Sequence, residues 1–193
     1  MISEVNAPAP VVIVTGPPGS GKTTVSRLIA DRLDCSVQIH ADDYWHNIRR
    51  GLVAPHLPQS ESQNALVIGI LADVALGYAM GGYTTVVDGI VGPWFLGPFI
   101  AATRAKRVPL HYIVLRPTLQ SALERARTRA DHALVDPASV VEKMYSEFRD
   151  LGSKEQFVID TTEHSIDETV LAVECRIAAG SNLVGPGAPS TRT

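Results

Sequence analysis

The sequence contains few lysines and no concentration of positive charge. Only four of its 17 basic residues are lysines, and no basic run is longer than two residues, as in Arg49-Arg50. The formal net charge is −3 at pH 7 and the sequence pI is about 6.0. Proteins that bind DNA or RNA usually present a strongly basic patch or stripe. The composition therefore argues against nucleic acid as a partner.

Cysteine and long apolar runs are scarce as well. The two cysteines, Cys35 and Cys175, lie far apart and have neither a metal-ligand spacing nor the pattern of a secreted disulfide framework. We expect both to be reduced. The N-terminus has no basic segment followed by an apolar run, and no uncharged apolar stretch reaches 18 residues. These absences predict no membrane contact and a cytoplasmic location, and they leave the oligomeric state open.

What the sequence does contain is a phosphate-binding motif. A short apolar run, Val11–Val14, leads into Gly16-Pro17-Pro18-Gly19-Ser20-Gly21-Lys22-Thr23-Thr24. The glycines allow the backbone to coil so that successive N–H groups face an anion at the start of a helix. Lys22 supplies a cation for the β- and γ-phosphates, and the Thr23 hydroxyl is placed to bind Mg²⁺.

A glycine-rich turn with an incidental lysine is the alternative reading of this stretch. The motif requires a buried strand before it and a helix after it. Val11–Val14 supplies the strand, and Val25, Leu28, Ile29 and Leu33 recur at helical spacing. This context favours the phosphate-binding interpretation, and it predicts ATP and Mg²⁺ as ligands.

Apolar β-type runs alternate with helical patterns along the chain. Strands are expected at 11–14, 36–40, 83–89, 110–115 and 157–160. Helices are expected after Thr23, over Tyr44–Arg50, over Asn64–Met80, up to Arg104, over Thr118–Ala130, from Pro137, and from the capping box Ser165-Ile166-Asp167-Glu168 to about Ala179. Alternation of this kind predicts a three-layer α/β sandwich around a five-stranded parallel sheet. We expect a single domain over residues 1–180 and a disordered tail over 181–193.

Three carboxylates follow predicted strands. Asp42 and Asp43 come after the second strand, and Asp88 ends the third. An acid directly after an apolar strand, in a chain with a phosphate loop, is a candidate to act in the Mg²⁺ shell, although an Asx-turn is the alternative for Asp88. Asp43 is favoured as the general base that accepts a proton from an acceptor hydroxyl. Asp42 is the other candidate, and one of the pair is equally suited to cap a helix.

A second cluster of candidates is basic and aromatic. Arg125 and Arg129 share one helix face and are candidates for nucleotide contact, with a solvated charged face as the alternative. Arg49 and Arg50 would hold an anionic group on an acceptor if they are not simply solvated. Three aromatic residues, Trp45, Trp94 and Phe95, are equally consistent with an acceptor pocket and with core packing.

These residues resemble a known group of proteins. The loop Gly16–Thr23, the acid Asp43 in Asp-Tyr-Trp-His and the pair Arg125-x3-Arg129 look like the P-loop small-molecule kinases related to adenylate kinase, gluconate kinase, chloramphenicol phosphotransferase and the zeta toxins. The resemblance implies a P-loop nucleoside triphosphate hydrolase fold of the nucleotide and shikimate kinase type. It also implies that Asp43 is the base, that Arg125 lies over adenine and that Arg129 reaches phosphate.

The same resemblance places the adenine edge and the lid. It implies that the backbone at Thr161 and Thr162 holds the adenine edge, and that a short lid lies near residues 129–136. The function expected is an ATP- and Mg²⁺-dependent kinase acting on a hydroxyl of a small molecule. The alternatives are a nucleotide-binding switch or slow NTPase that acts through a protein partner, a zeta-toxin-like enzyme, and a nucleotide kinase.

Overall fold

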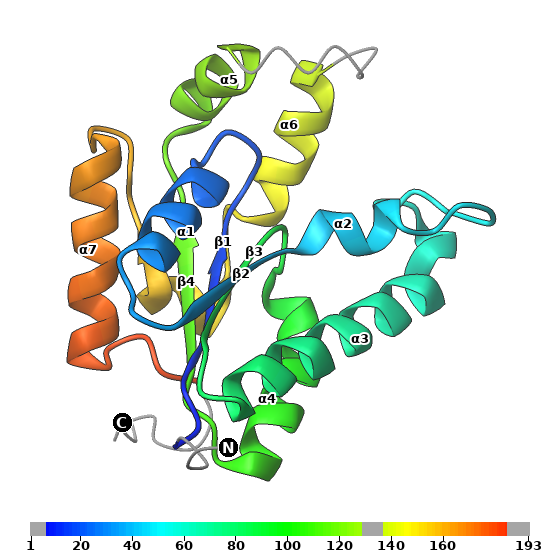
Figure 1. The fold of residues 1–193 in the computed structure, drawn as a ribbon. Coiled ribbons are helices and arrows are strands. Elements are labelled where there is room, and N and C mark those ends of the chain that lie inside the picture. The colour runs from blue at the N-terminus through cyan, green and yellow to red at the C-terminus, as the bar shows by residue number, and fades with distance from the viewer. Residues whose placement is uncertain (1–6, 129–136, 185–193) are drawn as a thin grey trace.

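A parallel β-sheet with helices on both faces forms the centre of the molecule (Figure 1). The computed structural model describes residues 7–128 and 137–184. Its strands in these ranges are β1 (Val11–Thr15), β2 (Ser36–His40), β3 (Thr84–Asp88), β4 (Leu110–Leu115) and β5 (Val158–Ile159). They lie in the order β2-β3-β1-β4-β5, and every neighbouring pair is parallel. The predicted three-layer α/β fold with a five-stranded parallel sheet is confirmed.

The helices occupy three positions around this sheet. They are α1 (Lys22–Asp31), α2 (Ala41–His46), α3 (Glu61–Met80), α4 (Leu96–Lys106), α5 (Leu119–Thr128), α6 (Pro137–Glu147) and α7 (Ile166–Ala179), with short 3₁₀ helices η1 (Pro58–Ser60), η2 (Pro93–Phe95) and η3 (Gly152–Phe157). Figure 1 shows α1 and α7 on one face, α3 and α4 on the other, and α5 and α6 beyond the carboxyl ends of the strands. The carboxyl edge is where open α/β sheets bind ligands.

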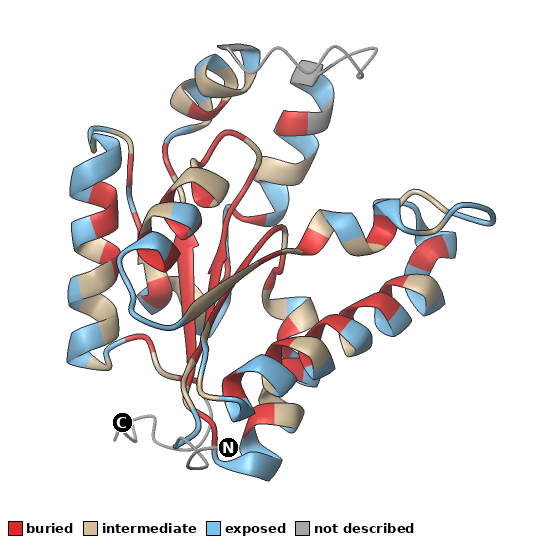
Figure 2. Cartoon of the chain, in the orientation of Figure 1, coloured by how far each residue is buried: buried red, intermediate tan, exposed pale blue. Residues whose placement is uncertain are grey.

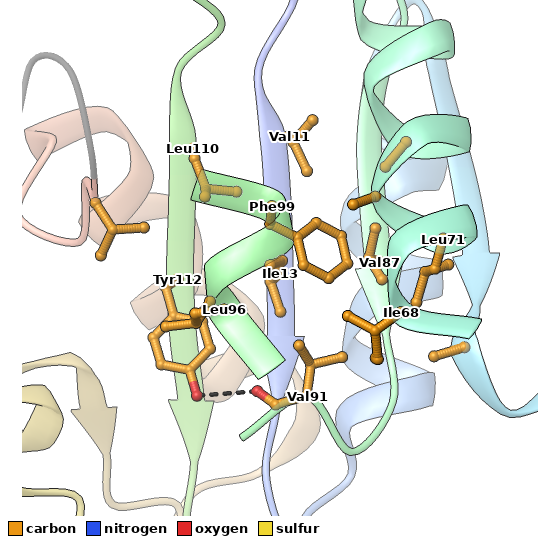
Figure 3. Close-up of a cluster of buried hydrophobic side chains, with 14 of the residues drawn as sticks. Val11, Ile13, Ile68, Leu71, Val87, Val91, Leu96, Phe99, Leu110 and Tyr112 are labelled. Atoms are coloured by element: carbon orange, nitrogen blue, oxygen red, sulfur yellow. Dashed lines mark hydrogen bonds between the residues drawn. The ribbon is translucent and has the colours of Figure 1, made fainter. Parts of the chain in front are cut away.

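The central strand β1 is buried on both of its faces. Val11 and Ile13 belong to the cluster beneath α3 and α4, whereas Val12 and Val14 belong to the cluster beneath α1 and α7. Figure 3 shows the first cluster, in which the Tyr112 hydroxyl donates a hydrogen bond of 3.0 Å to the Val91 carbonyl. Successive side chains of a strand point to opposite faces. An uninterrupted run of β-branched residues is therefore what a strand covered on both sides requires.

Helix α3 is longer and less uniformly buried than the sequence indicated. It begins at Glu61 rather than Asn64, and Ile68 and Leu71 are buried while Leu66 is 64% exposed. Buried and exposed positions alternate along it in Figure 2. By length and composition alone, the 23 residues Pro58–Met80 are apolar enough to cross a membrane, with a mean hydropathy of 1.4. Of the most apolar 18-residue stretch within them, 39% is buried in the structure. Pro58–Met80 is not an uncharged stretch, because it contains Glu61 and Asp73, so the expectation that no uncharged apolar run reaches 18 residues holds.

The start of the expected disordered tail is ordered against the sheet. The Tyr112 N–H donates to the Asn182 carbonyl at 2.9 Å, and the Val184 N–H donates to the Leu110 carbonyl at 2.9 Å. Asn182 is fully buried and Val184 is 5% exposed. Because β5 pairs only with the last two residues of β4, the first half of β4 has an open edge that this segment covers. Residues 185–193 lie outside the described part of the chain.

This contact predicts a pH dependence of stability. His111 Nδ1 lies 3.0 Å from Asn182 Oδ1, and burial lowers the pKa of His111 below its usual 6.5. A depressed histidine pKa contributes stability above pH 6.5, and this contribution is lost as the pH falls and the ring is forced to take a proton. In urea unfolding at about pH 7.5 and about pH 5.5, His111→Gln should therefore lose less stability between the two conditions than the wild type does.

The control for this experiment is the exposed histidine of α2, in the variant His46→Gln. We expect it to show the same loss of stability on acidification as the wild type. An equal loss in His111→Gln and the wild type would contradict the role of the buried ring.

Candidate active site

The predicted phosphate loop connects β1 to the first residue of α1, and close packing makes its glycines necessary. A Cβ on Gly19, whose φ is +79°, would lie 2.1 Å from the Ala122 carbonyl oxygen of α5. A Cβ on Gly16 would lie 2.1 Å from the Leu115 carbonyl oxygen at the end of β4. The loop backbone is therefore pressed against two other elements, and this packing fixes its curvature. Gly21, at φ +85°, has open space where a Cβ would be, so only its backbone angle requires glycine.

The polar groups of the loop suit an anionic ligand. Lys22 is 7% exposed, and its ammonium donates to the Pro17 carbonyl across the loop at 3.5 Å. The Ser20 hydroxyl is buried and finds no hydrogen-bond partner within the described residues. Thr23 and Thr24 are half-buried in the first turn of α1, where the backbone N–H groups carry partial positive charge. An unpaired buried donor, a lysine and a helix N-terminus in one loop fit the phosphate oxygens of a nucleotide.

Behind the loop lies a buried carboxylate, that of Asp88. Its side chain is 0% exposed. One oxygen accepts a hydrogen bond of 3.2 Å from Gln38 Nε2, which also donates to the Thr23 carbonyl at 3.4 Å. The other oxygen is 3.1 Å from His40 Nδ1. Gln38 thereby links the Asp88 carboxylate to the backbone of Thr23, the residue predicted to bind Mg²⁺.

The imidazole of His40 continues this chain of contacts toward Asp42. His40 Nε2 lies 3.7 Å from Asp42 Oδ2, so the ring stands between the carboxylates of Asp88 and Asp42. Sequence reasoning leaves Gln38 and His40 out of the predicted site, and notes of His40 only that it lies near the acids without a metal-ligand spacing. The two-residue period of a strand is the signal that could have found them, because positions 38 and 40 lie on the same face of β2. The parallel register then pairs His40 with Asp88.

The helix that carries Asp42 and Asp43 starts earlier than expected. α2 begins at Ala41, with His40 as the N-cap residue and no side-chain capping bond. The alternative that one of these acids caps a helix at Tyr44 is therefore wrong, and both lie in the first turn. Neighbouring residues on a helix point about 100° apart. Asp42 lines a large cavity, whereas Asp43 is exposed and not among the residues that line it.

This cavity has a volume of about 1100 Å³ and opens beside α2. Its walls come from α2, the segment 52–58, the first turns of α3, the residues around η2 and the end of α6. Trp45, Trp94 and Phe95 all line it, although Trp45 is also packed in the core, so both sequence interpretations hold for that residue. No residue of the phosphate loop is among the residues that line the cavity. Asp42, which does line it, contacts His40, and His40 in turn contacts Asp88.

A buried polar network holds one wall of the cavity in place. Trp45 Nε1 donates to Asn64 Oδ1 at 2.9 Å, and Asn64 Nδ2 donates to the Pro55 carbonyl at 2.8 Å. Gln63 Oε1 accepts a hydrogen bond of 2.9 Å from the Val53 N–H, and Gln63 Nε2 donates one of 2.7 Å to the Val53 carbonyl. These bonds tie α2 and the irregular segment before η1 to the start of α3. A fully satisfied network of this kind gives the wall one defined shape.

The residues expected at the adenine edge are brought together at the other end of the site. Arg125 Nη2 donates to the carbonyls of Thr161 and Thr162 at 3.0 and 3.1 Å. The Thr161 hydroxyl is buried with no hydrogen-bond partner in the described part of the chain. Hydrogen bonds from the Thr162 side chain and backbone lower the pKa of Asp160, which keeps that carboxylate ionised under the turn. Arg129 and the predicted lid near 129–136 lie outside the described residues.

A phosphate loop between the central strand and its following helix, at the carboxyl edge of a sheet in this order, defines a P-loop protein of the α/β class. Residues 11–151 match the family model described as AAA domain, and the chain belongs to that family. No curated protein matches the sequence.

Solved structures share the fold. One is the tunicamycin resistance protein of Deinococcus radiodurans, with 21% identity, a TM-score of 0.62, and coverage of 92% of this chain and 99% of that one. A gluconokinase from Sinorhizobium meliloti has 19% identity, a TM-score of 0.65, and coverage of 91% and 96%. The APS kinase of Mycobacterium tuberculosis, in complex with AMPPNP and APS, has 20% identity, a TM-score of 0.65, and coverage of 88% and 98%. The predicted resemblance to P-loop small-molecule kinases is confirmed at the level of fold.

The packing of the loop predicts a difference between two glycine variants. Gly19→Ala should be destabilised by about 1–2 kcal/mol for its positive φ, and by about a further 1–3 kcal/mol for the contact with the Ala122 carbonyl. Gly21→Ala has the same kind of backbone angle but open space, so it should show only the first of these losses. Chemical denaturation of both variants measures the difference. Equal losses would show that the loop is not pressed against α5.

Proposed function

We propose that the protein is an ATP- and Mg²⁺-dependent phosphotransferase that acts on a hydroxyl group of a small molecule. One observation carries the proposal. An unbroken chain of contacts runs from Thr23 through Gln38, Asp88 and His40 to Asp42, and Asp42 lines a separate cavity. The phosphate loop and the cavity are thus linked through the Asp88 carboxylate, and group transfer needs a second-substrate site positioned with respect to the phosphate site.

Each residue of the site has a role that its position supports. Lys22 and the loop N–H groups would hold the phosphate oxygens, and the Thr23 hydroxyl and the Asp88 carboxylate would hold Mg²⁺ directly or through water. Mg²⁺ supplies charge that offsets the negative charge of the transferring group. Arg125, Thr161 and Thr162 bound the adenine side. Gly16, Pro17, Pro18, Gly19, Ser20, Gly21 and Thr24 form the cradle and its helical continuation.

The acceptor hydroxyl needs a base, and Asp42 has the better position. Either acid would take the hydroxyl proton while the acceptor oxygen bonds to the γ-phosphorus and the bond to the ADP oxygen breaks. The sequence favoured Asp43, and both remain candidates. We place Asp42 first because it lines the cavity and contacts His40, whereas Asp43 is exposed and is not among the lining residues. A protein that only hydrolyses nucleotide slowly as a switch has no need of a second cavity beside such an acid.

The nucleotide site predicts distinct effects for two substitutions. Lys22→Ala should weaken Mg²⁺·ATP binding at least about tenfold, because it removes a charge-assisted contact to phosphate. Thr23→Val keeps the shape but removes the hydroxyl ligand, so it should weaken ATP binding with Mg²⁺ and leave binding in EDTA nearly unchanged. Titration calorimetry on protein checked for folding by circular dichroism measures both. Unchanged ATP affinity in folded Lys22→Ala would refute the phosphate site.

The base is identified by a matched pair of asparagine variants. Phosphoryl transfer from radiolabelled ATP is first measured on the wild type with gluconate, AMP, glycerol and propranolol as acceptors. With the acceptor that is used, Asp42→Asn should lower kcat by about 10²- to 10⁴-fold, because an amide cannot take the proton, and should leave the Kd for ATP intact. Asp43→Asn should lower kcat far less. The reverse ranking would assign the base to Asp43, and full activity in both would remove general-base catalysis from the proposal.

A further inference from the structure

The size of the cavity is the first indication of what it accepts. At about 1100 Å³ it lies just above the range of roughly 300–1,000 Å³ found for sites that enclose drug-sized ligands. Its outer wall is the segment before α3, which is held by Asn64 and Gln63 rather than left loose. A small polyol would leave most of such a space filled with water. The volume favours an acceptor of several rings or a comparable bulk.

The lining is the second indication, since it is mostly apolar. Aromatic and aliphatic side chains converge on it from four elements, among them Trp45, Phe95, Ile68, Ile90 and Met144. Trp94 is 48% exposed although its ring is fixed by edge contacts with Phe95 and Phe148, at centroid distances of 6.1 and 5.7 Å. A large aromatic face that is immobile but uncovered is typical of a surface on which a ligand stacks.

Charge gives the third indication. The titratable side chains of the lining are the carboxylates of Asp42, Glu61 and Glu147 and the imidazoles of His46 and His56, and no lysine or arginine is among the described lining residues. Arg49 and Arg50, which the sequence offered for an anionic group, are exposed and are not part of the lining. Sites for phosphate or carboxylate use arginine or lysine. This cavity would repel an anion.

We propose that the acceptor is a bulky, largely apolar alcohol that carries no anionic group. The inference rests on the proposed function and deepens it by naming the class of the second substrate. It separates this chain from kinases whose acceptor is a nucleotide, a sugar acid or a sulfated compound, because each of those brings a negative charge into the cavity. The apolar part of the acceptor would lie between Trp94 and the start of α3, with its hydroxyl at Asp42.

The test uses a variant that fills the cavity without removing any contact. Ala65 is an exposed residue of α3 that lines the cavity, and Ala101 is an exposed alanine of α4 that does not. Binding of the neutral dye Nile red is followed by fluorescence in the absence of nucleotide. We expect propranolol to displace the dye and gluconate and AMP to leave it bound. Ala65→Trp should weaken dye binding at least about tenfold, and Ala101→Trp should leave it unchanged.

Two further measurements separate this inference from the proposed function. Mg²⁺·ATP affinity, measured by calorimetry, should be the same in the wild type and in both tryptophan variants, while phosphoryl transfer to propranolol should fall in Ala65→Trp alone. Displacement of the dye by gluconate or AMP, preferential phosphorylation of either, or dye binding unaffected by Ala65→Trp would overturn the acceptor class. Failure of the wild type to bind Mg²⁺·ATP would instead overturn the phosphotransferase assignment.

Discussion

The carboxylate of Asp88 is the constraint on which the arrangement of the site depends. It is fully buried, and an unpaired charge in that position would be costly to the fold. Gln38 and His40 satisfy its two oxygens from the neighbouring strand, so the register of β2 against β3 is fixed by polar contacts as well as by the backbone ladder. Because α2 begins directly after His40, this same register determines where Asp42 stands. One buried carboxylate thus aligns the phosphate loop with the side of α2 that lines the cavity.

The parts of the fold that the sequence predicted are those that local rules determine. β4 agrees with its expected bounds, since a short, mostly apolar run closed by Arg116-Pro117 is too short for a helix and favours a strand. Both hydrogen bonds of the predicted capping box, between Ser165 and Glu168, are present in the structure. This motif is predictable because it depends only on two residues three positions apart in the sequence. The phosphate loop was predictable for the same reason: its glycines, Lys22 and Thr23 form one contiguous motif.

The parts that were missed depend on contacts between distant residues. At its first residue, Ala41, α2 packs against Gly89, where a Cβ would lie 2.5 Å from that of Ala41, and no local pattern shows this closeness. The pairing of 182–184 with β4 follows from the shortness of β5, which itself is visible only once the sheet is assembled. The cavity depends on Asn64, an amide that reads from the sequence as an ordinary polar residue near the start of a helix. Its three partners come from α2, from Pro55 and from Ser60.

The two halves of the site have opposite physical characters, and this contrast bears on the chemistry. The phosphate-loop side consists of backbone N–H groups, Lys22 and the buried Asp88, whereas the far side is a mostly apolar cavity whose lining includes the carboxylates of Asp42, Glu61 and Glu147. An apolar acceptor that fills the cavity would expel water from the neighbourhood of Asp42, and with less water present the charges around the transferring group act more strongly. Water is also the competing nucleophile. The same hydrophobic contact that binds the acceptor would therefore direct the phosphoryl group to a hydroxyl and away from hydrolysis, without any residue devoted to excluding water.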